Sequence, residues 1–247
     1  MKAMILAAGL GTRLKPLTDT MPKALVPVGG KPLLQHTIEK LKSSGFDEII
    51  INIHHFGQQI IDFVESNNHF DIRIEFSDER EKLLDTGGGI KKASWFFDDG
   101  KPFLIHNVDI LSNINLYELY AFHLKTLSPA TLVCSRRQTS RYLLFDGENH
   151  LKGWINEKNG EVKSPFPNFN PEIHQKLAFS GIHILQPSVF HYMENFSDKF
   201  SIIDFYLSIC DKDHLCCYAP KGLLIMDVGK PGSLQEIQNL PDFYHPY

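Results

Sequence analysis

The chain has 247 residues, of which 43% are hydrophobic and 22% are charged. This is enough to build a large globular domain, and it excludes an intrinsically disordered chain. The 25 basic and 29 acidic residues give a net charge of −4, so there is no overall basic field to attract nucleic acid or an anionic membrane.

The start of the chain differs in charge from the rest. Five bases and one acid fall within residues 1–31, a local charge of +4 that leaves −8 for the remainder. Such a local excess predicts an anionic ligand near the N-terminus. The residues are Lys2, Arg13, Lys15, Lys23 and Lys31, with Asp19 as the acid.

No apolar run approaches the roughly 18 to 20 residues of a membrane span. The opening MKAMILAAGLGTRL has too short an apolar stretch for a signal peptide. We therefore expect a soluble cytoplasmic protein with no membrane partner. Cys134 and Cys210 are isolated and Cys216 and Cys217 are adjacent, a spacing that fits neither a zinc site nor a disulfide framework and predicts reduced core thiols.

The first 110 residues alternate β-rich runs with helical patterns. Pro32 opens a segment whose apolar residues recur at helical spacing as far as Gly45. Strands that alternate with helices in this way predict a parallel sheet covered on both faces, with ligands outside the carboxyl ends of its strands. The expected strands are 2–8, 48–54, 71–77 and 102–106, and the expected helices are 32–45, 58–65 and 89–97.

After about residue 128 the pattern becomes richer in strands. The turn Asp146-Gly147 predicts a hairpin between 142–145 and 151–155. We expect one doubly wound α/β domain whose second half extends the sheet into a substrate-side lobe. The other expected strands are 131–135, 177–185, 214–218 and 223–228, and the expected helices are 188–195, 202–210 and one that begins at Pro231.

Small residues at the end of the first strand indicate a phosphate-binding loop. Ala7, Ala8, Gly9 and Gly11 would let consecutive backbone N–H groups approach an anion. Arg13 would add a bidentate fork to phosphate, and Lys23 a point charge, but solvated surface charges are the alternative. Neither GxxxxGK[ST] nor GxGxxG is present, which disfavours a P-loop protein and a Rossmann oxidoreductase.

The longer string GLGTRLKPLTDTMPKALVPVGGKPLL, residues 9–34, resembles the N-terminal motif of the sugar-1-phosphate nucleotidyltransferases. The resemblance continues through DTGGGI (85–90), NVD (107–109), FSGIH (179–183) and DVGKP (227–231). It implies an α/β fold, Rossmann-like and doubly wound. The mixed, mainly parallel sheet would carry helices on both faces and a small β-rich substrate lobe. Residues 1–247 would form a single domain, with a nucleotide-binding half at 1–127 and a sugar-phosphate-binding half at 128–240.

The family reaction joins an NTP to a sugar 1-phosphate and gives an NDP-sugar and pyrophosphate. Both reacting groups are anions, so positive charge and positioning are the main requirements. By resemblance, Arg13 would bind the β and γ phosphates and Lys23 the α-phosphate region. The full set implied for the nucleotide is Leu6, Ala7, Ala8, Gly9, Gly11, Thr12, Arg13, Lys23, Glu79, Gly87 and Gly88.

Two acids each follow a strand-like run, Asp109 after 102–106 and Asp227 at the end of 223–226. In the family, acids at these motif positions hold Mg²⁺, a cation that prefers a few carboxylates and phosphate oxygens. Helix-capping or loop aspartates are the alternative. The resemblance thus implies Mg²⁺ as the cofactor and Arg13, Lys23, Asp109 and Asp227 as the catalytic set.

Residues of the second half would bind the sugar phosphate. Glu157-Lys158 resembles the EKP element of the family, although Asn159 stands in place of its proline, and a solvated charge pair is the alternative. Ser180-Gly181 matches an element that contacts sugar hydroxyls, or is ordinary strand. The implied set is Asn107, Glu157, Lys158, Ser180 and Gly181.

The sequence indicates the identity of the NTP and of the sugar less strongly than it indicates the reaction. LAAG at 6–9, in place of LAGG, favours UTP, and INIHHFGQQIIDFVE (51–65) resembles the N-acetylmuramate-1-phosphate uridylyltransferases of cell-wall precursor metabolism. Mannose- or heptose-1-phosphate guanylyltransferases and phosphocholine cytidylyltransferases remain alternatives, and a catalytically silent regulatory subunit is a remote one. The expected partners are the small-molecule substrates, with the oligomeric state open. The length after the last helix leaves no room for a β-helix domain.

Overall fold

The computed structural model describes residues 1–229 and 232. Its centre is a 10-stranded sheet. Eight of the strands follow the order β11-β10-β9-β12-β6-β1-β4-β5, and the other two are β8, which pairs with β12, and β13, which pairs with β8. The main strands of the first half of the chain are β1 (Lys2–Leu6), β4 (Glu48–Ile53), β5 (Arg73–Asp78) and β6 (Phe103–Asn107).

These four strands are parallel, and β1 lies between β4 and β6. The chain leaves β1 toward β4 and β5 on one side and later returns to form β6 on the other. The strand order therefore reverses beside β1, and the connections on either side of that point diverge to leave a crevice at the carboxyl ends of β1 and β6. Nearly all side chains of β1 and β4 are buried, as in a sheet covered on both faces.

Two helical layers cover the sheet. Helices α1 (Leu33–Ser43), α2 (Gly57–Ser66) and α4 (Leu116–Thr126) share one hydrophobic core with its first face. Helices α3 (Asp85–Lys92), α5 (Val189–Met193) and α6 (Ile202–Ile209) share the other. In α1 the buried side chains recur at helical spacing, including Leu34, Ile38 and Leu41, so the apolar stripe of the helix faces the sheet.

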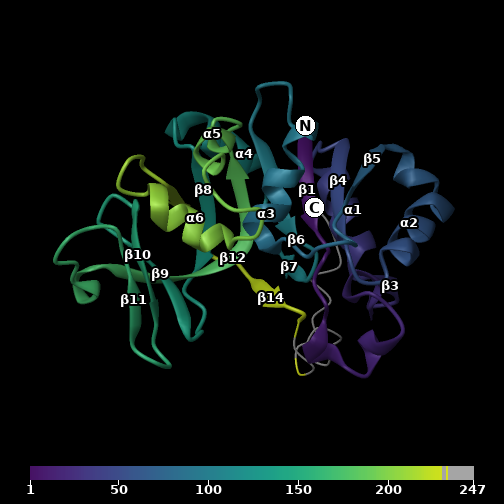
Figure 1. Ribbon diagram of the computed structural model, residues 1–247, viewed down its shortest axis with the longest axis horizontal. Helices are drawn as coiled ribbons and strands as arrows, with labels where there is room; N and C mark the ends of the chain where they lie inside the picture. Colours follow the sequence, from purple (N-terminus) through teal and green to yellow (C-terminus); the bar gives the residue numbers. More distant parts are fainter. Residues whose placement is uncertain (230–231, 233–247) are drawn as a thin grey trace.

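Strand β12 (Gln175–Leu185) connects the two halves of the chain. It pairs antiparallel with β6 on one side and with β8 (Ala130–Ser135) on the other, and its first residues pair with β9 (Arg141–Phe145). Strands β9, β10 (Leu151–Asn156) and β11 (Glu161–Lys163) form the lobe seen at the left of Figure 1. Strand β13 (Cys216–Tyr218) pairs parallel with β8.

Two small antiparallel ladders lie beside the main sheet. Strand β14 (Ile225–Asp227) pairs with β7 (Ile110–Ser112), and β2 (Pro27–Val28) pairs with β3 (Lys31–Pro32). Short 3₁₀ helices fill the loops: η1 (Thr12–Leu14), η2 (Leu17–Asp19), η3 (Lys23–Leu25), η4 (Asn68–Asp71), η5 (Ser94–Phe96) and η6 (Pro171–Ile173). Figure 1 shows β14 and the opening segment at the same end of the sheet, where β1 finishes.

The predicted α/β class, with a mainly parallel sheet and helices on both faces, is confirmed, and so is the hairpin of β9 and β10. Helix α4 and the short strands β7 and β11 were not predicted. The helix expected over 89–97 begins earlier, at Asp85, and its last part is the separate 3₁₀ turn η5. The helix expected from Pro231 lies outside the described residues.

All four cysteines are free, and Cys134, Cys210 and Cys217 are buried. These three agree with the prediction of core thiols, whereas Cys216 is only partly buried. No helix in the described part of the chain has the length and apolar character of a membrane span.

Candidate functional site

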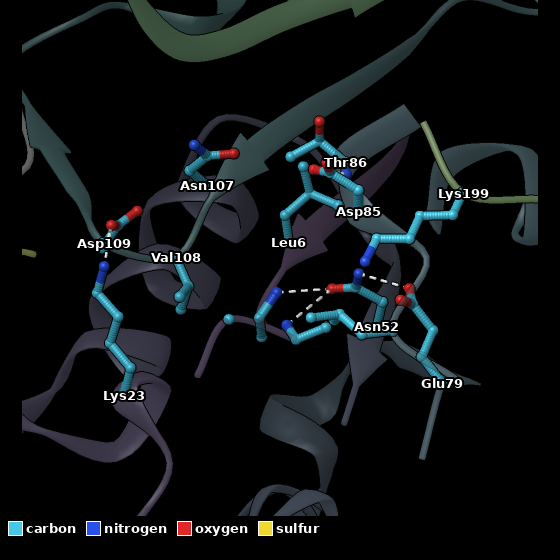
Figure 2. Close-up of a pocket in the computed structure, with 14 residues that line it drawn as sticks. Leu6, Lys23, Asn52, Glu79, Asp85, Thr86, Asn107, Val108, Asp109 and Lys199 are labelled. Carbon is cyan, nitrogen blue, oxygen red and sulfur yellow. Dashed lines mark hydrogen bonds and ion pairs between the residues drawn. The ribbon is translucent and has the colours of Figure 1, made fainter. Parts of the chain in front are cut away.

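A cavity of about 410 Å³ opens at the carboxyl ends of β1, β4 and β6. This is the crevice that the reversal of strand order produces. Figure 2 shows an ion pair at one end of the cavity and a group of hydrogen-bonded side chains at the other, with Leu6 and Val108 between them. The lining residues are Leu6, Ala7, Ala8, Gly9, Lys23, Asn52, Glu79, Leu83, Asp85, Thr86, Asn107, Val108, Asp109 and Lys199.

The ion pair joins the Nζ of Lys23 to the Oδ2 of Asp109. Lys23 begins the 3₁₀ turn η3, and Asp109 lies in the turn between β6 and β7. Their side chains are only 10% and 16% exposed, so solvent screens this pair less than it screens a surface salt bridge. The sequence places both residues in the candidate catalytic set, and the structure brings them into contact.

Asp227 reaches the same place through the pairing of β14 with β7. The ladder sets Asp227 opposite Ile110, next to Asp109 in the chain, and the Val228 amide donates to the Asp109 carbonyl at 2.8 Å. The Oδ1 of Asp227 accepts from the Gly229 amide at 2.9 Å. Asp227, far from Asp109 in the sequence, is therefore held beside the segment of Asp109, which lines the cavity.

Gly229 marks the point where the charged groups converge. A Cβ atom placed on Gly229 would lie 2.7 Å from the Nζ of Lys23, 2.8 Å from the Oδ1 of Asp227 and 3.0 Å from an Nη of Arg13. The four members of the predicted catalytic set are thus gathered in one place, with Arg13 exposed to solvent. Two cations beside two carboxylates form a site suited to phosphate groups and a metal ion.

The two carboxylates, Asp109 and Asp227, suit Mg²⁺ better than they suit a metal ion whose ligands all come from the protein. Within residues 1–229 and 232 there is no group of three or more His, Cys, Asp or Glu side chains that could hold a metal. Mg²⁺ is commonly held by one or two carboxylates together with substrate phosphates and water. Asp109 and Asp227 are such a pair, and the cavity beside them leaves space for a phosphate.

The glycine-rich loop differs in part from the prediction. The amides of Ala7 and Ala8 donate to the Oδ1 of Asn52, at 2.6 and 3.2 Å, so they are not available to an anion. Gly11 adopts a φ of 64°, and a Cβ there would lie 2.9 Å from the Cγ2 of Thr18. The loop then enters η1 at Thr12. The N–H groups left for a phosphate are those from Gly9 onward.

The structure does not place Gly87 and Gly88 against the cavity. Both lie inside α3, where a Cβ on Gly87 would lie 2.3 Å from the ring of Phe200 and one on Gly88 would lie 2.0 Å from the Asp198 carbonyl. The helix packs so closely on segment 198–200 that only glycine fits. These two residues therefore serve packing, and Asp85 and Thr86 before them line the cavity.

Among the residues predicted for the sugar phosphate, Asn107 lines the cavity. Gly181 has a φ of 78° and lies so close to the Asn107 side chain that a Cβ would be 2.4 Å from its Nδ2. The hydroxyl of Ser180 is buried and donates to the Val133 carbonyl at 2.8 Å, so it is not directed to a sugar. His106, which precedes Asn107 in β6, is buried. Burial lowers the pKa of His106 to about 4, so its ring is neutral at physiological pH.

The structure places Glu157 and Lys158 at the turn between β10 and β11, in the lobe. Glu157 forms an ion pair with Lys176 at 3.3 Å, and Lys158 is exposed. Neither lines the cavity described above. Their assignment to the sugar phosphate stays a prediction.

Comparison with known proteins identifies the family of the chain. A family model described as nucleotidyl transferase matches residues 2–241. The chain belongs to the nucleotidyl transferase family. The match includes all four charged residues that converge at Gly229.

Three curated relatives show how the family resemblance is distributed. An N-acetylmuramate alpha-1-phosphate uridylyltransferase of Neisseria meningitidis is 36% identical over 78% of this chain and 79% of its own. The protein of that name in Caulobacter vibrioides is 30% identical over 93% and 92%. A mannose-1-phosphate guanyltransferase of Yarrowia lipolytica is 34% identical over 76% of this chain, which spans 50% of that relative.

A solved structure of UDP-glucose pyrophosphorylase complexed with UDP-glucose shares the fold. It has a TM-score of 0.76 and 20% identity, and the match covers 96% of this chain and 97% of that one. At this identity the likeness concerns the fold alone, and it agrees with the mixed sheet and its two helical layers.

Asn52 and Lys199 line the cavity of this nucleotidyl transferase and were not predicted. Asn52 lies within a run of β-branched residues in β4, where nothing in the sequence distinguishes a buried amide with a specific role. Lys199 comes from the segment before α6 and reaches the cavity only through tertiary packing.

Proposed function

We propose that this nucleotidyl transferase catalyses the reaction of an NTP with a sugar 1-phosphate. A phosphate oxygen of the sugar phosphate attacks the α-phosphorus, the bond from the α-phosphorus to the oxygen that bridges to the β-phosphorus breaks, and pyrophosphate leaves. The observation that carries the proposal is the convergence of Lys23, Arg13, Asp109 and Asp227 around Gly229, beside a cavity of about 410 Å³.

The cations address the main obstacle to this reaction, which is repulsion between two anions. Lys23 is held near the end of β6, where an α-phosphate in the cavity would lie close to its ammonium group. Arg13 is exposed on the outer side of the same cluster, a place suited to the outer phosphates and the leaving pyrophosphate. Because the nucleophile is already ionised, the site needs charge and position rather than a general base.

Mg²⁺ belongs to the same proposal. Asp109 and Asp227 would hold it, and the ion would neutralise charge on the phosphate oxygens. The ion pair of Asp109 with Lys23 also links metal binding to the position of Lys23. A group that competes for Asp109 would free Lys23 to turn toward the phosphate.

For the substrates, we propose UTP and N-acetylmuramate 1-phosphate. The support comes from two uridylyltransferase relatives, one of which is matched over 92% of its length, and from LAAG at 6–9. Both oxygens of the buried Glu79 already accept hydrogen bonds, from Asn52 and from the amide of Leu84. Because Glu79 is also only 1% exposed, its carboxylate is poorly placed to accept from N1–H and N2–H of guanine.

A second candidate is GTP with mannose 1-phosphate, which the 34% identity to the Yarrowia enzyme favours. A matrix of four NTPs and a panel of sugar 1-phosphates, with pyrophosphate release as the readout, separates the candidates. We expect the highest kcat/KM for UTP with N-acetylmuramate 1-phosphate. A maximum for GTP with mannose 1-phosphate would support the second candidate, and no release with any pair would indicate a catalytically silent subunit.

A further inference from the structure

A row of buried hydrogen bonds crosses the floor of the nucleotide cavity. Its centre is Asn52, which lies in β4 and is 3% exposed. The Oδ1 of Asn52 accepts from the amides of Ala7 and Ala8, and its Nδ2 donates to the Oε1 of Glu79 at 2.8 Å. Figure 2 shows these three bonds, with the Asn52 side chain between the backbone of the loop and Glu79.

The row continues from Glu79 to the start of α3. Glu79 is 1% exposed, and its Oε2 accepts from the amide of Leu84 at 3.1 Å. Leu84 directly precedes α3, whose first residues Asp85 and Thr86 line the cavity. One wall of the cavity, the segment after β1, is thus connected to the opposite wall through two side chains.

Gly89 supplies the space that these side chains require. A Cβ on Gly89 would lie 2.7 Å from the Oε1 of Glu79 and 3.0 Å from the Nδ2 of Asn52. The third glycine of the DTGGGI motif therefore faces the hydrogen-bonded pair, whereas the first two face segment 198–200. Any larger residue at this position would push the pair toward the cavity.

Stability alone does not account for this arrangement. A nearly buried carboxylate loses its hydration, and apolar side chains of similar volume are often at least as stabilising. What polar side chains provide is direction, because the Asn52 amide satisfies its neighbours in only one orientation. Its oxygen must face the two N–H donors and its nitrogen must face the carboxylate.

We infer that Asn52 and Glu79 are positioning residues that hold the two walls of the nucleotide cavity at the spacing an NTP requires. The inference rests on the proposed function, in which the cavity takes an NTP. It also gives Glu79 a different role from the direct nucleotide contact expected from the sequence. Glu79 acts on the nucleotide through Asn52 and Leu84, because it is only 1% exposed and both of its carboxylate oxygens already accept from protein groups.

The polarity of the pair provides a direct test. In Asn52→Asp an oxygen replaces Nδ2 and faces the Glu79 carboxylate, which breaks the row. In the double variant Asn52→Asp/Glu79→Gln the direction of the central bond is reversed. The amide nitrogen of the new glutamine would donate to position 52, its oxygen would still accept from Leu84, and the total charge of the pair would be conserved.

The experiment uses the full chain and measures the Kd for UTP by calorimetry, and then kcat and KM by pyrophosphate release. We expect Asn52→Asp to raise the Kd and KM for UTP at least about tenfold. The double variant should return both to within about threefold of wild type. The KM for the sugar phosphate should change less than twofold. Asn67→Asp, which makes the same substitution at the exposed end of α2, is the matched control and should behave as wild type.

Amide hydrogen exchange gives a readout that does not depend on activity. Exchange at Ala7, Ala8 and Leu84 should accelerate in Asn52→Asp and slow again in the double variant. An Asn52→Asp protein with unchanged UTP binding, or a double variant that is no better than the single one, would overturn the inference while leaving the proposed function intact. A wild-type protein that binds NTP but transfers nothing would overturn the proposed reaction alone, and one that binds no NTP would overturn both.

Discussion

The Nζ of Lys23 forms an ion pair with the Oδ2 of Asp109, and so joins the segment after β1 to the turn after β6. The pair closes one end of the nucleotide cavity. Because Asp227 and Arg13 lie around the same ammonium group, a change in any of these charges alters the electrostatics of the whole cluster.

Asp109→Asn keeps the shape of the side chain and removes its charge. We expect kcat to fall at least about 100-fold, because both a proposed ligand of Mg²⁺ and the partner of Lys23 are lost. The variant should lose stability, because Lys23 loses a mostly buried partner, but it should remain folded at 25 °C, which circular dichroism would check. Lys31→Ala, which removes the exposed pair of Lys31 with Glu39, is the control and should leave kcat unchanged. Turnover of Asp109→Asn within threefold of wild type would contradict the catalytic role.

Asp227→Asn tests the metal. If Asp227 holds Mg²⁺ together with Asp109, the variant should need at least about tenfold more Mg²⁺ for half-maximal pyrophosphate release. Wild-type protein in excess chelator should lose its turnover and regain it when Mg²⁺ is added back. Asp62→Asn on the exposed side of α2 serves as the control. Full turnover in the presence of chelator would exclude the proposed role of the metal.

Gly229→Ala places one methyl group in the middle of the charged cluster. Its Cβ would lie 2.7 Å from the Nζ of Lys23 and 2.8 Å from the Oδ1 of Asp227, so these side chains must move apart. We expect kcat/KM to fall about 10- to 100-fold, since small displacements of positioned groups are costly in catalysis. Gly147→Ala, where a Cβ meets nothing within 4 Å, should retain wild-type activity. Equal activity of the two variants would show that the cluster tolerates displacement.

Lys199→Ala removes a cation from the other end of the cavity. This exposed side chain lines the cavity, and no carboxylate is paired with it in the described part of the chain. At the high dielectric of an exposed site, its attraction for an NTP is worth about 1 kcal/mol. The KM for the NTP should therefore rise about three- to tenfold, with kcat unchanged. Lys125→Ala on α4, on the opposite helical layer, is the control, and an unchanged KM would remove Lys199 from the site.

Because three histidines are buried, we expect the free energy of unfolding to decrease as the pH falls below about 6.5. Burial lowers the pKa of His106 and His123 to about 4 and that of His183 to about 3. The unfolded chain, with pKa values near 6.5, binds more protons than the folded one between about pH 6.5 and pH 4. The contribution of these rings is complete above about pH 6.5 and is lost as the pH falls toward 4, by up to about 1.4 kcal/mol per pH unit for each ring.

Urea unfolding at pH 7.5, 6.0 and 5.0 measures this effect. The free energy of unfolding should decrease at each step, and His183→Gln should flatten the dependence by roughly one proton. His55→Gln on the exposed loop after β4 should leave the slope unchanged. A free energy that is constant over this range would show that the buried rings are protonated in the folded protein.

Local patterns predicted most of the sheet but not every helix. The buried runs of β1, β4 and β6 and the turn at Asp146-Gly147 are strong signals, and each appears in the structure. Helix α4 was missed because Tyr117 and Leu124 are 66% and 54% exposed, which blurs its apolar stripe. Helix α3 begins at Asp85 despite three consecutive glycines, since tight packing on segment 198–200 outweighs their low helix propensity.

The site likewise contains residues that the sequence predicted and residues that it did not. Lys23 and Asp109 were selected by the resemblance of long motifs to the family, and the structure brings them into contact at the cavity. Asn52 could not be predicted, because its role depends on which backbone amides a neighbouring strand brings beside it. Ser180 was predicted to contact a sugar, but its hydroxyl is bonded to Val133, a contact fixed by the pairing of β12 with β8.

Strand β12 has a consequence for any attempt to divide the protein. Because it lies against β6 along its last residues and against β9 along its first, a fragment that ended at residue 127 would expose the unpaired border of β6 to water. Unpaired strand edges of this kind tend to form hydrogen bonds with strands of other chains and to aggregate. Such a fragment should precipitate rather than bind nucleotide, and insertions meant to regulate or label the enzyme are better placed at the hairpin tip around Gly147, where added bulk meets nothing.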